Sequence, residues 1–215
     1  AQPEVRIESV FSHLAGSDKP TEDNCTQKQI TRFEQLSSRI TDAFGYTIPR
    51  HILNSTGIAR FPDAQFEMVR LGIGLYGIDP SDSLQLQVVG TLRTRITQIK
   101  TVAKGETVGY DRSAVMQRDS RIAILPIGYA DGLSRTLSNG IGKVWISGKL
   151  APIVGKVCMD LCMVDVTDTN ATEGDTVEVF GEHLALQQLA QWMNTIPYEV
   201  LTAISQRVKR VYITE

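Results

Sequence analysis

The pattern of the sequence changes near Val88, and this change most constrains what the chain can fold into. Before Val88, strand-like runs alternate with helix-like runs, which is typical of a parallel α/β structure. After Val88, short β-rich runs follow one another with turn residues between them, which is typical of an antiparallel, barrel-like β structure. We therefore predict an α/β plus mainly-β fold class, with one domain at residues 1–87 and a second at residues 88–215.

The first 87 residues are predicted to hold one long helix among several strands. Apolar residues recur at helical spacing between Thr26 and Ala43, and Gly45 is a suitable C-terminal stop. The other predicted elements are a strand at Val5–Phe11, a strand at His51–Leu53, a short helix around Pro62–Phe66 and a strand at Met68–Tyr76. Three such strand units are less than half of an eight-unit β/α barrel.

The remaining residues are predicted to be mostly β structure with two helices. The predicted strands are Val88–Lys100, Thr107–Gly109, Arg121–Leu125, Lys143–Ile146, Ala151–Val157, Met163–Val166, Asp175–Phe180 and Val208–Ile213. Only Leu186–Thr195 and Tyr198–Ile204 have a helical pattern.

The bulk composition argues against several classes of function. The chain has 215 residues, 42% hydrophobic residues and a net charge of −2. A slightly negative charge does not indicate a nucleic-acid partner, and no apolar run approaches membrane-spanning length. Three cysteines are too few for a disulfide framework, which favours a cytoplasmic setting. Cys158 and Cys162 lack a second Cys or His pair, so buried thiols explain them better than a metal site.

Three glycine-containing loops lie beside predicted strands in the second domain. They are Gly105–Arg112, Pro126–Arg135 and Gly155–Asp160. Glycine allows sharp turns and close approach to a ligand, and each loop also carries polar or aromatic side chains. Any one of them alone is better explained as an ordinary strand turn, so the argument for a site depends on their co-occurrence.

Polar groups also follow the predicted strands of the first domain. His13 follows the first strand, Asn54 and Ser55 follow the second, and the Gly72–Ile73 backbone lies near the third. In β/α barrels the active site lies at the carboxyl ends of the strands. We therefore predict that His13, Asn54 and Ser55 converge on one face of this domain.

Several segments carry a resemblance to a known family. They are Ser12-His13, Asn54-Ser55, Arg60-Phe61-Pro62, Val69 to Gly77, Gly109-Tyr110, Gly128-Tyr129-Ala130-Asp131-Gly132 and Gly155-Lys156-Val157-Cys158-Met159-Asp160. In these segments, and in their order, the chain resembles the alanine racemases, which are fold-type III enzymes that use pyridoxal 5'-phosphate (PLP). The resemblance implies the last part of an N-terminal eight-stranded barrel followed by a complete C-terminal β domain.

The resemblance implies a catalytic base on Tyr110. A phenol has a pKa near 10, so it needs help to act near neutral pH. In the family that help is a hydrogen-bonded line that would here run from Tyr110 through His13 to Arg70. Arg70 would also meet the pyridine nitrogen of PLP, and because arginine stays charged it would keep that nitrogen unprotonated.

The remaining implied site residues would hold the cofactor, hold the substrate or line the entrance. The Ser55 hydroxyl and the backbone N–H groups near Gly72 and Ile73 would bind the phosphate, and Asn54 would lie by the ring oxygen. The Met159 N–H would bind the substrate carboxylate, and Tyr129 would narrow the pocket. The family's substrate entrance matches Asp18, Arg135, Lys156 and Ile204.

Two departures from the family pattern are visible. The family commonly has tyrosine at the position of Gln206, where the ring contacts the phosphate and forms part of an inner gate. Gln206 can still donate a hydrogen bond, so the departure leaves the substrate range open. In addition, none of the 8 lysines matches the family's Lys-Ala-Asn-Ala-Tyr-Gly segment, which carries the Schiff-base lysine. We therefore expect the sequence to be the C-terminal part of a longer racemase, inactive by itself.

The implied function is interconversion of L- and D-alanine for bacterial peptidoglycan, in a homodimer whose subunits share each active site. Tyr110, Tyr129 and Met159 would act in the partner subunit's site. Two alternatives remain open: a racemase with another or broader amino-acid substrate, and a non-catalytic module that binds an amino acid or a partner.

Overall fold

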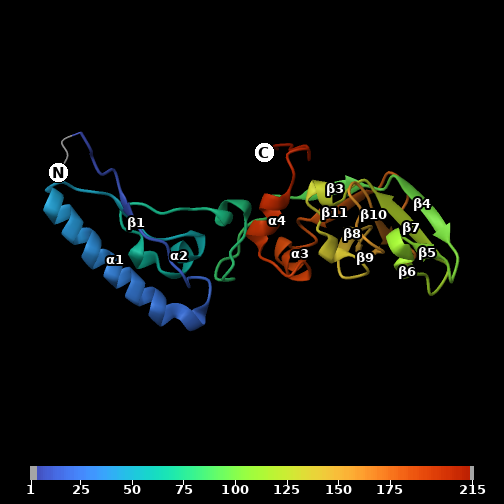
Figure 1. Ribbon diagram of the computed structural model, residues 1–215, viewed down its shortest axis with the longest axis horizontal. Helices are drawn as coiled ribbons and strands as arrows, with labels where there is room; N and C mark the ends of the chain where they lie inside the picture. The colour runs from blue at the N-terminus through green and yellow to red at the C-terminus, as the bar shows by residue number, and fades with distance from the viewer. Residues whose placement is uncertain (1–3, 214–215) are drawn as a thin grey trace. The chain divides into compact units, whose positions relative to one another are not determined.

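The computed structural model describes residues 4–213. The chain divides into two compact units, residues 1–89 and 90–215. Figure 1 shows the helices of the first unit in blue to teal and the strands of the second in green to orange.

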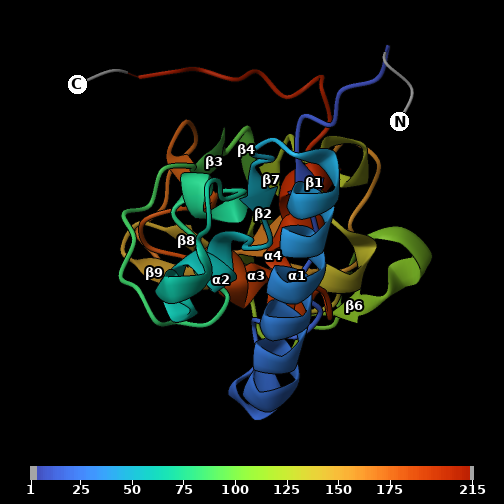
Figure 2. The same cartoon turned by 90° about the vertical axis from the view of Figure 1, so that its left-hand side faces the viewer.

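The first unit is built around one long helix. Helix α1 spans Asp23–Phe44, and its buried residues Thr26, Ile30, Phe33 and Ser37 follow the three- and four-residue spacing of a single helix face. It ends at Gly45, whose φ of 71° is left-handed and whose N–H bonds to the Thr41 carbonyl oxygen. The predicted helix and its glycine stop are therefore confirmed. Figure 2 shows this helix, in blue, as one continuous element.

Two short parallel strands provide the frame of this unit. Strand β1 (Val10–Phe11) pairs in parallel with β2 (Arg50–His51). Helix α2 (Ser55–Arg60) follows β2, and the Asn54 side chain caps it by accepting the Gly57 N–H. The buried core joins the two kinds of element, because Ile30 and Phe33 of α1 lie in one cluster with Ile52 and Leu53, which are 0% exposed.

Three strand predictions in this unit need correction. Only Val10 and Phe11 of the predicted Val5–Phe11 strand, and only His51 of His51–Leu53, lie in a ladder. The Met68–Tyr76 prediction is wrong, because the chain is irregular there until a short 3-10 helix at Ile73–Tyr76. The physical reason is that the Gly72 and Gly74 N–H groups bond to the Ser55 hydroxyl instead of to a neighbouring strand. The helix predicted around Pro62–Phe66 is a 3-10 turn at Pro62–Ala64.

The second unit is an antiparallel β structure. Its seven-stranded sheet has the order β3-β11-β8-β9-β10-β7-β4, and β5 and β6 form a separate two-stranded hairpin. The strands are β3 (Leu92–Arg95), β4 (Gln98–Val102), β5 (Thr107–Val108), β6 (Ala114–Val115), β7 (Ser120–Leu125), β8 (Lys143–Ile146), β9 (Lys149–Val154), β10 (Cys162–Asp165) and β11 (Thr176–Phe180).

The sheet curls because its two outer strands are consecutive in the chain. Strands β3 and β4 are separated only by Ile96 and Thr97, although they stand at opposite ends of the strand order. Ile96 N–H bonds to Asp175 O at 3.0 Å beside β11, and Thr97 N–H bonds to Ile124 O at 3.0 Å on β7. The bend at Ile96 and Thr97 therefore lets one continuous segment form both outer strands of the sheet. This gives the sheet its barrel-like form.

Most sequence predictions for this unit are confirmed. The buried strand predicted at Arg121–Leu125 is β7, and Tyr129 lies on the loop after it. The two predicted helices are α3 (Leu186–Trp192) and α4 (Pro197–Ala203), which pack against each other. Two strand predictions need correction. The single strand predicted at Val88–Lys100 is two strands, β3 and β4, separated by Ile96 and Thr97, and the strand predicted at Val208–Ile213 is wrong because these residues form no ladder. The Arg210 guanidinium donates to the carbonyl oxygens of Ile204, Ser205 and Val208, which holds the chain in an irregular path.

The described residues thus form part of a β/α barrel and an antiparallel, barrel-like β domain. Within residues 4–213, no helix is long and apolar enough to cross a membrane.

A buried carboxylate holds the loop after β11. The Glu178 side chain is 5% exposed and accepts the N–H groups of His183 at 2.7 Å and Leu184 at 3.0 Å. The His183 ring lies 3.2 Å from the same carboxylate and stacks on Trp145. Burial alone would raise the pKa of Glu178, but these donors outweigh burial and lower it.

We predict that Glu178→Gln lowers the free energy of unfolding at pH 7 by about 1–3 kcal/mol, because the buried donors lose a charged acceptor. The loss should shrink as the pH falls below 4.5, because a lowered pKa contributes stability only while the carboxyl is ionised. Urea unfolding, monitored by tryptophan fluorescence, measures this loss in the free energy of unfolding, since Trp145 and Trp192 both lie in the second unit. Exposed Glu182→Gln is the control, and an equal effect of both substitutions would contradict the prediction.

Candidate functional site

The Arg70 side chain joins the carboxyl ends of the two parallel strands. Its Nη2 donates to Ser12 O at 2.8 Å, just after β1, and to Ile52 O at 3.2 Å, just after β2. Its Nη1 donates to His51 O at 3.1 Å. The guanidinium is therefore fixed by backbone carbonyl groups of both strands.

Two histidine rings accept hydrogen bonds from the same guanidinium. Arg70 Nη1 lies 2.6 Å from His51 Nδ1, and Arg70 Nη2 lies 3.3 Å from His13 Nδ1. Because a guanidinium can only donate, each Nδ1 must be the unprotonated ring nitrogen. The His51 proton is then on Nε2, from which it can be donated to the Ser9 hydroxyl at 3.3 Å. His13 and Arg70 thus lie together, as predicted from the sequence.

The positive charge of Arg70 has no acidic partner among residues 4–213. Its contacts are carbonyl oxygens, imidazole nitrogens and the Phe11 ring, whose centroid lies 5.5 Å from Cζ. Burial lowers the pKa of Arg70. Burial, and secondarily the charge of Arg70, also lower the pKa of His51, which keeps that ring neutral. Arg70 Nε has no acceptor in the described part of the chain, so one donor of the fork remains available.

A second group of donors lies around Ser55. The Ser55 Oγ accepts the N–H groups of Gly72 at 2.9 Å and Gly74 at 3.2 Å, which leaves its own hydroxyl proton free to be donated. Between these glycines, the Ile73 N–H has no acceptor within residues 4–213. A hydroxyl and a free backbone N–H placed side by side are suited to a phosphate or carboxylate.

Asn54 precedes Ser55 directly, and two hydrogen bonds to its side-chain oxygen hold it in place. Its Oδ1 accepts the Gly57 N–H at 2.8 Å and the Ser17 hydroxyl at 3.1 Å. The amide nitrogen has no acceptor among the described residues, so it can donate to a ligand. Asn54, Ser55 and the Gly72–Ile73 backbone therefore form one polar group at the start of α2.

Tyr110 is held on a strained turn of the second unit. It follows Gly109, whose φ is 85°, and precedes Asp111 and Arg112, whose φ values are 57° and 52°. Lys156 forms an ion pair with Asp111, which ties this turn to the Gly155–Asp160 loop. The Lys156 contact lowers the pKa of Asp111. Tyr110 as a whole residue is 68% exposed.

Tyr129 and Met159 are brought together by backbone pairing. Tyr129 N–H bonds to Cys158 O at 3.0 Å, and Ala130 N–H bonds to Met159 O at 3.0 Å. The Met159 N–H has no acceptor within the described residues. Both side chains are accessible, at 42% exposure for Tyr129 and 54% for Met159.

The remaining residues predicted for the site lie at helix ends or on exposed loops. Arg135 begins a 3-10 turn at Arg135–Leu137, and Ile204 caps α4. Gln206 and Asp18 are exposed, and Asp18 accepts the Ser17 hydroxyl at 3.4 Å. Asp18 lies in the first unit and the other three in the second.

Two residues in these sites were not singled out from the sequence. The sequence pattern indicates only that His51 belongs to a strand, whereas its register opposite Phe11 places it at the strand end. Arg207 follows Gln206 directly and bonds to two of the motif carboxylates, Asp131 and Asp160. No local signal identifies that contact, because the three residues are far apart in sequence.

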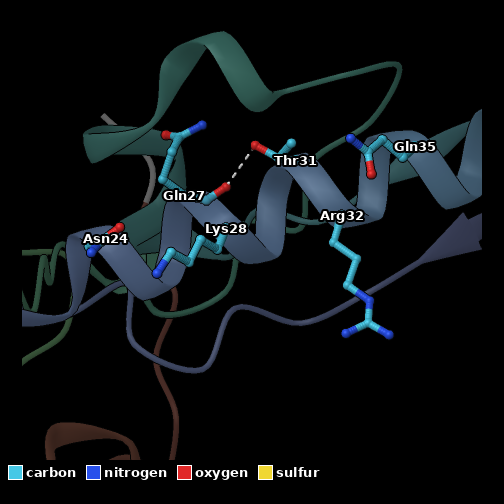
Figure 3. Close-up of a pocket in the computed structure, with 6 residues that line it drawn as sticks. All are labelled: Asn24, Gln27, Lys28, Thr31, Arg32 and Gln35. Carbon is cyan, nitrogen blue, oxygen red and sulfur yellow. Dashed lines mark hydrogen bonds between the residues drawn. The ribbon is translucent and has the colours of Figure 1, made fainter.

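A shallow pocket on α1 is not a candidate site. Figure 3 shows its lining, which consists of Asn24, Gln27, Lys28, Thr31, Arg32 and Gln35. The Thr31 hydroxyl is already bonded to the Gln27 carbonyl oxygen at 3.0 Å. The lining has no carboxylate, histidine or cysteine. Among the described residues there is also no cluster of His, Cys, Asp and Glu suited to a metal ion.

The fold and the first-unit site define a class of protein. A partial β/α barrel carries donors for an anion at its strand ends and is followed by an antiparallel β domain. Two family models match in the corresponding order: "Alanine racemase, N-terminal domain" at residues 1–80 and "Alanine racemase, C-terminal domain" at residues 89–212. The chain belongs to the alanine racemase family.

Individual relatives agree with this membership. Alanine racemase 1 of Clostridium acetobutylicum is 42% identical over 97% of this chain, and alanine racemase 2 of Caldanaerobacter subterraneus is 41% identical over 97%. The chain spans about half the length of these relatives, at 56% of each.

Solved structures give the same result. Alanine racemase from Bartonella henselae with covalently bound pyridoxal phosphate superposes with a TM-score of 0.87 at 36% identity, covering 97% of this chain and 57% of that one. Alanine racemase from Clostridium difficile 630 in complex with cycloserine has a TM-score of 0.88 at 37% identity, covering 97% and 56%.

We predict that the His51 ring titrates with a midpoint below 6.5, because burial and the Arg70 charge both oppose its protonation. NMR of the ring Cε1–H measures this directly. Since the folded-state pKa is lowered, folding stability should fall as the pH drops below 6.5. Arg70→Gln should raise the midpoint without restoring it fully, because burial remains. Arg118→Gln, an exposed change in the second unit, is the control, and a wild-type midpoint above 6.5 would refute the prediction.

Proposed function

We propose that this chain is the C-terminal portion of a PLP-dependent alanine racemase, which interconverts L- and D-alanine to supply peptidoglycan synthesis in the cytoplasm of a bacterium. The observation that carries the proposal is the Arg70 guanidinium, which has no acidic partner among residues 4–213 and contacts the Nδ1 atoms of His51 and His13 at the strand ends. Family membership supports the same reaction. We further propose that residues 1–87 are the last part of the cofactor-binding barrel and residues 88–215 the β domain.

The available donors fit the cofactor. The Ser55 hydroxyl and the free Ile73 N–H, next to Gly72, suit a phosphate, and the free Arg70 Nε suits an unprotonated pyridine nitrogen. The free amide nitrogen of Asn54 suits the ring oxygen. When bound, PLP supplies an electron sink that acidifies the α-hydrogen of the amino acid.

The chain's own residues would move one proton and orient the substrate. Tyr110 would exchange a proton with one face of the α-carbon, helped by the His13 and Arg70 line. The 3.3 Å contact between His13 Nδ1 and Arg70 Nη2 supports this part of the proposal. The free Met159 N–H would bind the substrate carboxylate. Tyr129 would limit the pocket to a small side chain, and Gln206 would contact the phosphate.

The rest of the site comes from outside these residues. We propose a homodimer in which Tyr110, Tyr129 and Met159 serve the partner's cofactor, and in which Asp18, Arg135, Lys156 and Ile204 line the entrance. The base for the second face would be the family's cofactor-bearing lysine, which none of the 8 lysines here matches. The 215 residues alone are therefore proposed to be inactive.

A chimera tests the function. We predict that this chain, joined to the N-terminal remainder of the Clostridium acetobutylicum relative, racemises alanine, whereas the 215 residues alone do not. Tyr110→Phe should lower turnover in the chimera by about 10²–10⁴-fold, because it removes one proton carrier. Exchange of the α-hydrogen with deuterated water, followed for each enantiomer, should be lost on one face only.

Tyr212→Phe is the matched control, because its ring is 90% exposed and it belongs to no proposed site. Turnover by the unextended chain, or equal exchange on both faces in Tyr110→Phe, would refute the proposal. A chimera that binds PLP without racemising any amino acid would favour the non-catalytic alternative.

Gln206, which is exposed, favours a second candidate function: a racemase that accepts amino acids larger than alanine. We predict that Gln206→Tyr in the chimera reduces kcat/KM for serine relative to alanine by about tenfold, because a ring would fill space that the amide leaves open. Coupled assays with both amino acids measure the ratio. Gln206→Asn keeps the amide and serves as the control; an unchanged ratio in Gln206→Tyr would show that this position does not set the substrate range.

A further inference from the structure

Arg207 connects two loops that carry proposed site residues. Its Nε donates to Asp131 Oδ1 at 2.7 Å, and its Nη2 donates to Asp160 Oδ1 at 2.7 Å. Asp131 lies two residues after Tyr129, and Asp160 follows Met159 directly. Arg207 itself follows Gln206. One guanidinium thus touches both loops from a third segment of the chain.

The Asp131 carboxylate is the best-enclosed member of this group. Its side chain is 13% exposed, compared with 47% for Arg207 and 59% for Asp160. Its second oxygen, Oδ2, accepts the Gly128 N–H at 2.8 Å, so the carboxylate fixes its own loop as well as the guanidinium. Burial would raise the pKa of Asp131, but the Arg207 and Gly128 donors outweigh burial and lower it.

Backbone contacts make the same three segments meet closely. The 128–132 loop pairs with Cys158 and Met159 through the Tyr129 and Ala130 N–H groups, and Ser205 N–H bonds to Asp131 O at 3.2 Å. A Cβ on Gly128 would lie 2.3 Å from Met159 O, and one on Gly132 would lie 2.6 Å from Ala203 O. Small changes in loop position are therefore transmitted between the segments, since no space separates them.

The proposed site groups need such a fixed arrangement. The Met159 N–H can orient a carboxylate only if its peptide is held, and the Tyr129 ring limits the pocket only if its loop does not retract. Both residues are substantially exposed, at 42% for Tyr129 and 54% for Met159, so contacts from neighbouring segments matter for their position. The two charged contacts of Arg207 add side-chain links between the same loops that the backbone pairing joins.

We propose that Arg207 is a positioning residue for the proposed racemase, which holds Tyr129, the Met159 N–H and Gln206 in register by bridging Asp131 and Asp160. This inference rests on the proposed function for its consequence in catalysis, but its structural part can be tested without cofactor or activity. Arg207 acts through these neighbours and is not assigned a contact with substrate.

Amide hydrogen exchange on the 215-residue chain tests the structural part. In Arg207→Ala, the amides of Tyr129, Ala130 and Ser205 should exchange about tenfold faster, because the loops open more often. Amides of β7, such as Ile122 and Ala123, should not change. Arg207→Lys keeps the charge but cannot make both contacts in one plane, so it should give an intermediate increase.

Arg118→Ala is the matched control. Arg118 also makes a two-point contact with a carboxylate, Asp168, but that pair lies away from the three segments and is exposed on both sides. Equal exchange at Tyr129, Ala130 and Ser205 in Arg207→Ala and Arg118→Ala would overturn the proposal. If Arg207→Ala does not fold, Asp160→Asn against Asp168→Asn gives the same comparison at exposed carboxylates, and equal exchange there overturns it too.

The catalytic part is tested by steady-state kinetics of the chimera with alanine. Arg207→Ala should raise KM for alanine several-fold more than it lowers kcat, because the carboxylate-binding N–H is displaced while Tyr110 is not. An equal loss in both, with faster loop exchange, would overturn the link to substrate binding. If the unmodified chimera is inactive, the proposed function fails, while the exchange result still decides whether Arg207 positions the loops.

Discussion

The site of the first unit depends on one interaction, the insertion of the Arg70 guanidinium between the ends of two parallel strands. Its partners are the carbonyl oxygens of Ser12, His51 and Ile52 and two imidazole nitrogens, so its charge is solvated but not neutralised. Among residues 4–213 this charge has no counter-ion, and like the unbonded donors around Ser55 it favours an anionic or electron-rich ligand. The same contacts align the strand ends, so one guanidinium both holds the two strands and provides the charge of the proposed site.

The second unit uses charge in the opposite way. Arg207 is paired with Asp131 and Asp160, and Lys156 is paired with Asp111, so the cations there are neutralised locally. These pairs connect loops instead of attracting ligands. Their effect is positional, since exposed ion pairs contribute little to stability but can restrict where a loop lies. The two units thus divide the proposed work: the first provides binding charge, and the second provides fixed backbone and aromatic groups.

Closure of the sheet explains how the second unit brings its loops together. The strand patterns predicted β7, β8 and most other strands, but no local pattern predicts that β3 and β4 stand at opposite ends of the order. That order follows from the bend at Ile96 and Thr97, whose N–H groups reach β11 and β7 respectively. Strand existence is a local property, whereas strand order depends on pairing between distant segments.

The sequence by itself determined the elements with strong periodicity, such as α1 and β7, and the motif loops that carry Tyr110, Tyr129 and Met159. It also indicated that His13 and Arg70 belong together, through the family resemblance. Only the tertiary structure decided that Met68–Tyr76 is not a strand, because its glycine N–H groups bond to Ser55 Oγ. Only the tertiary structure added His51 and Arg207, because their roles are set by partners 19 or more residues away, and such contacts leave no periodic signal in the chain.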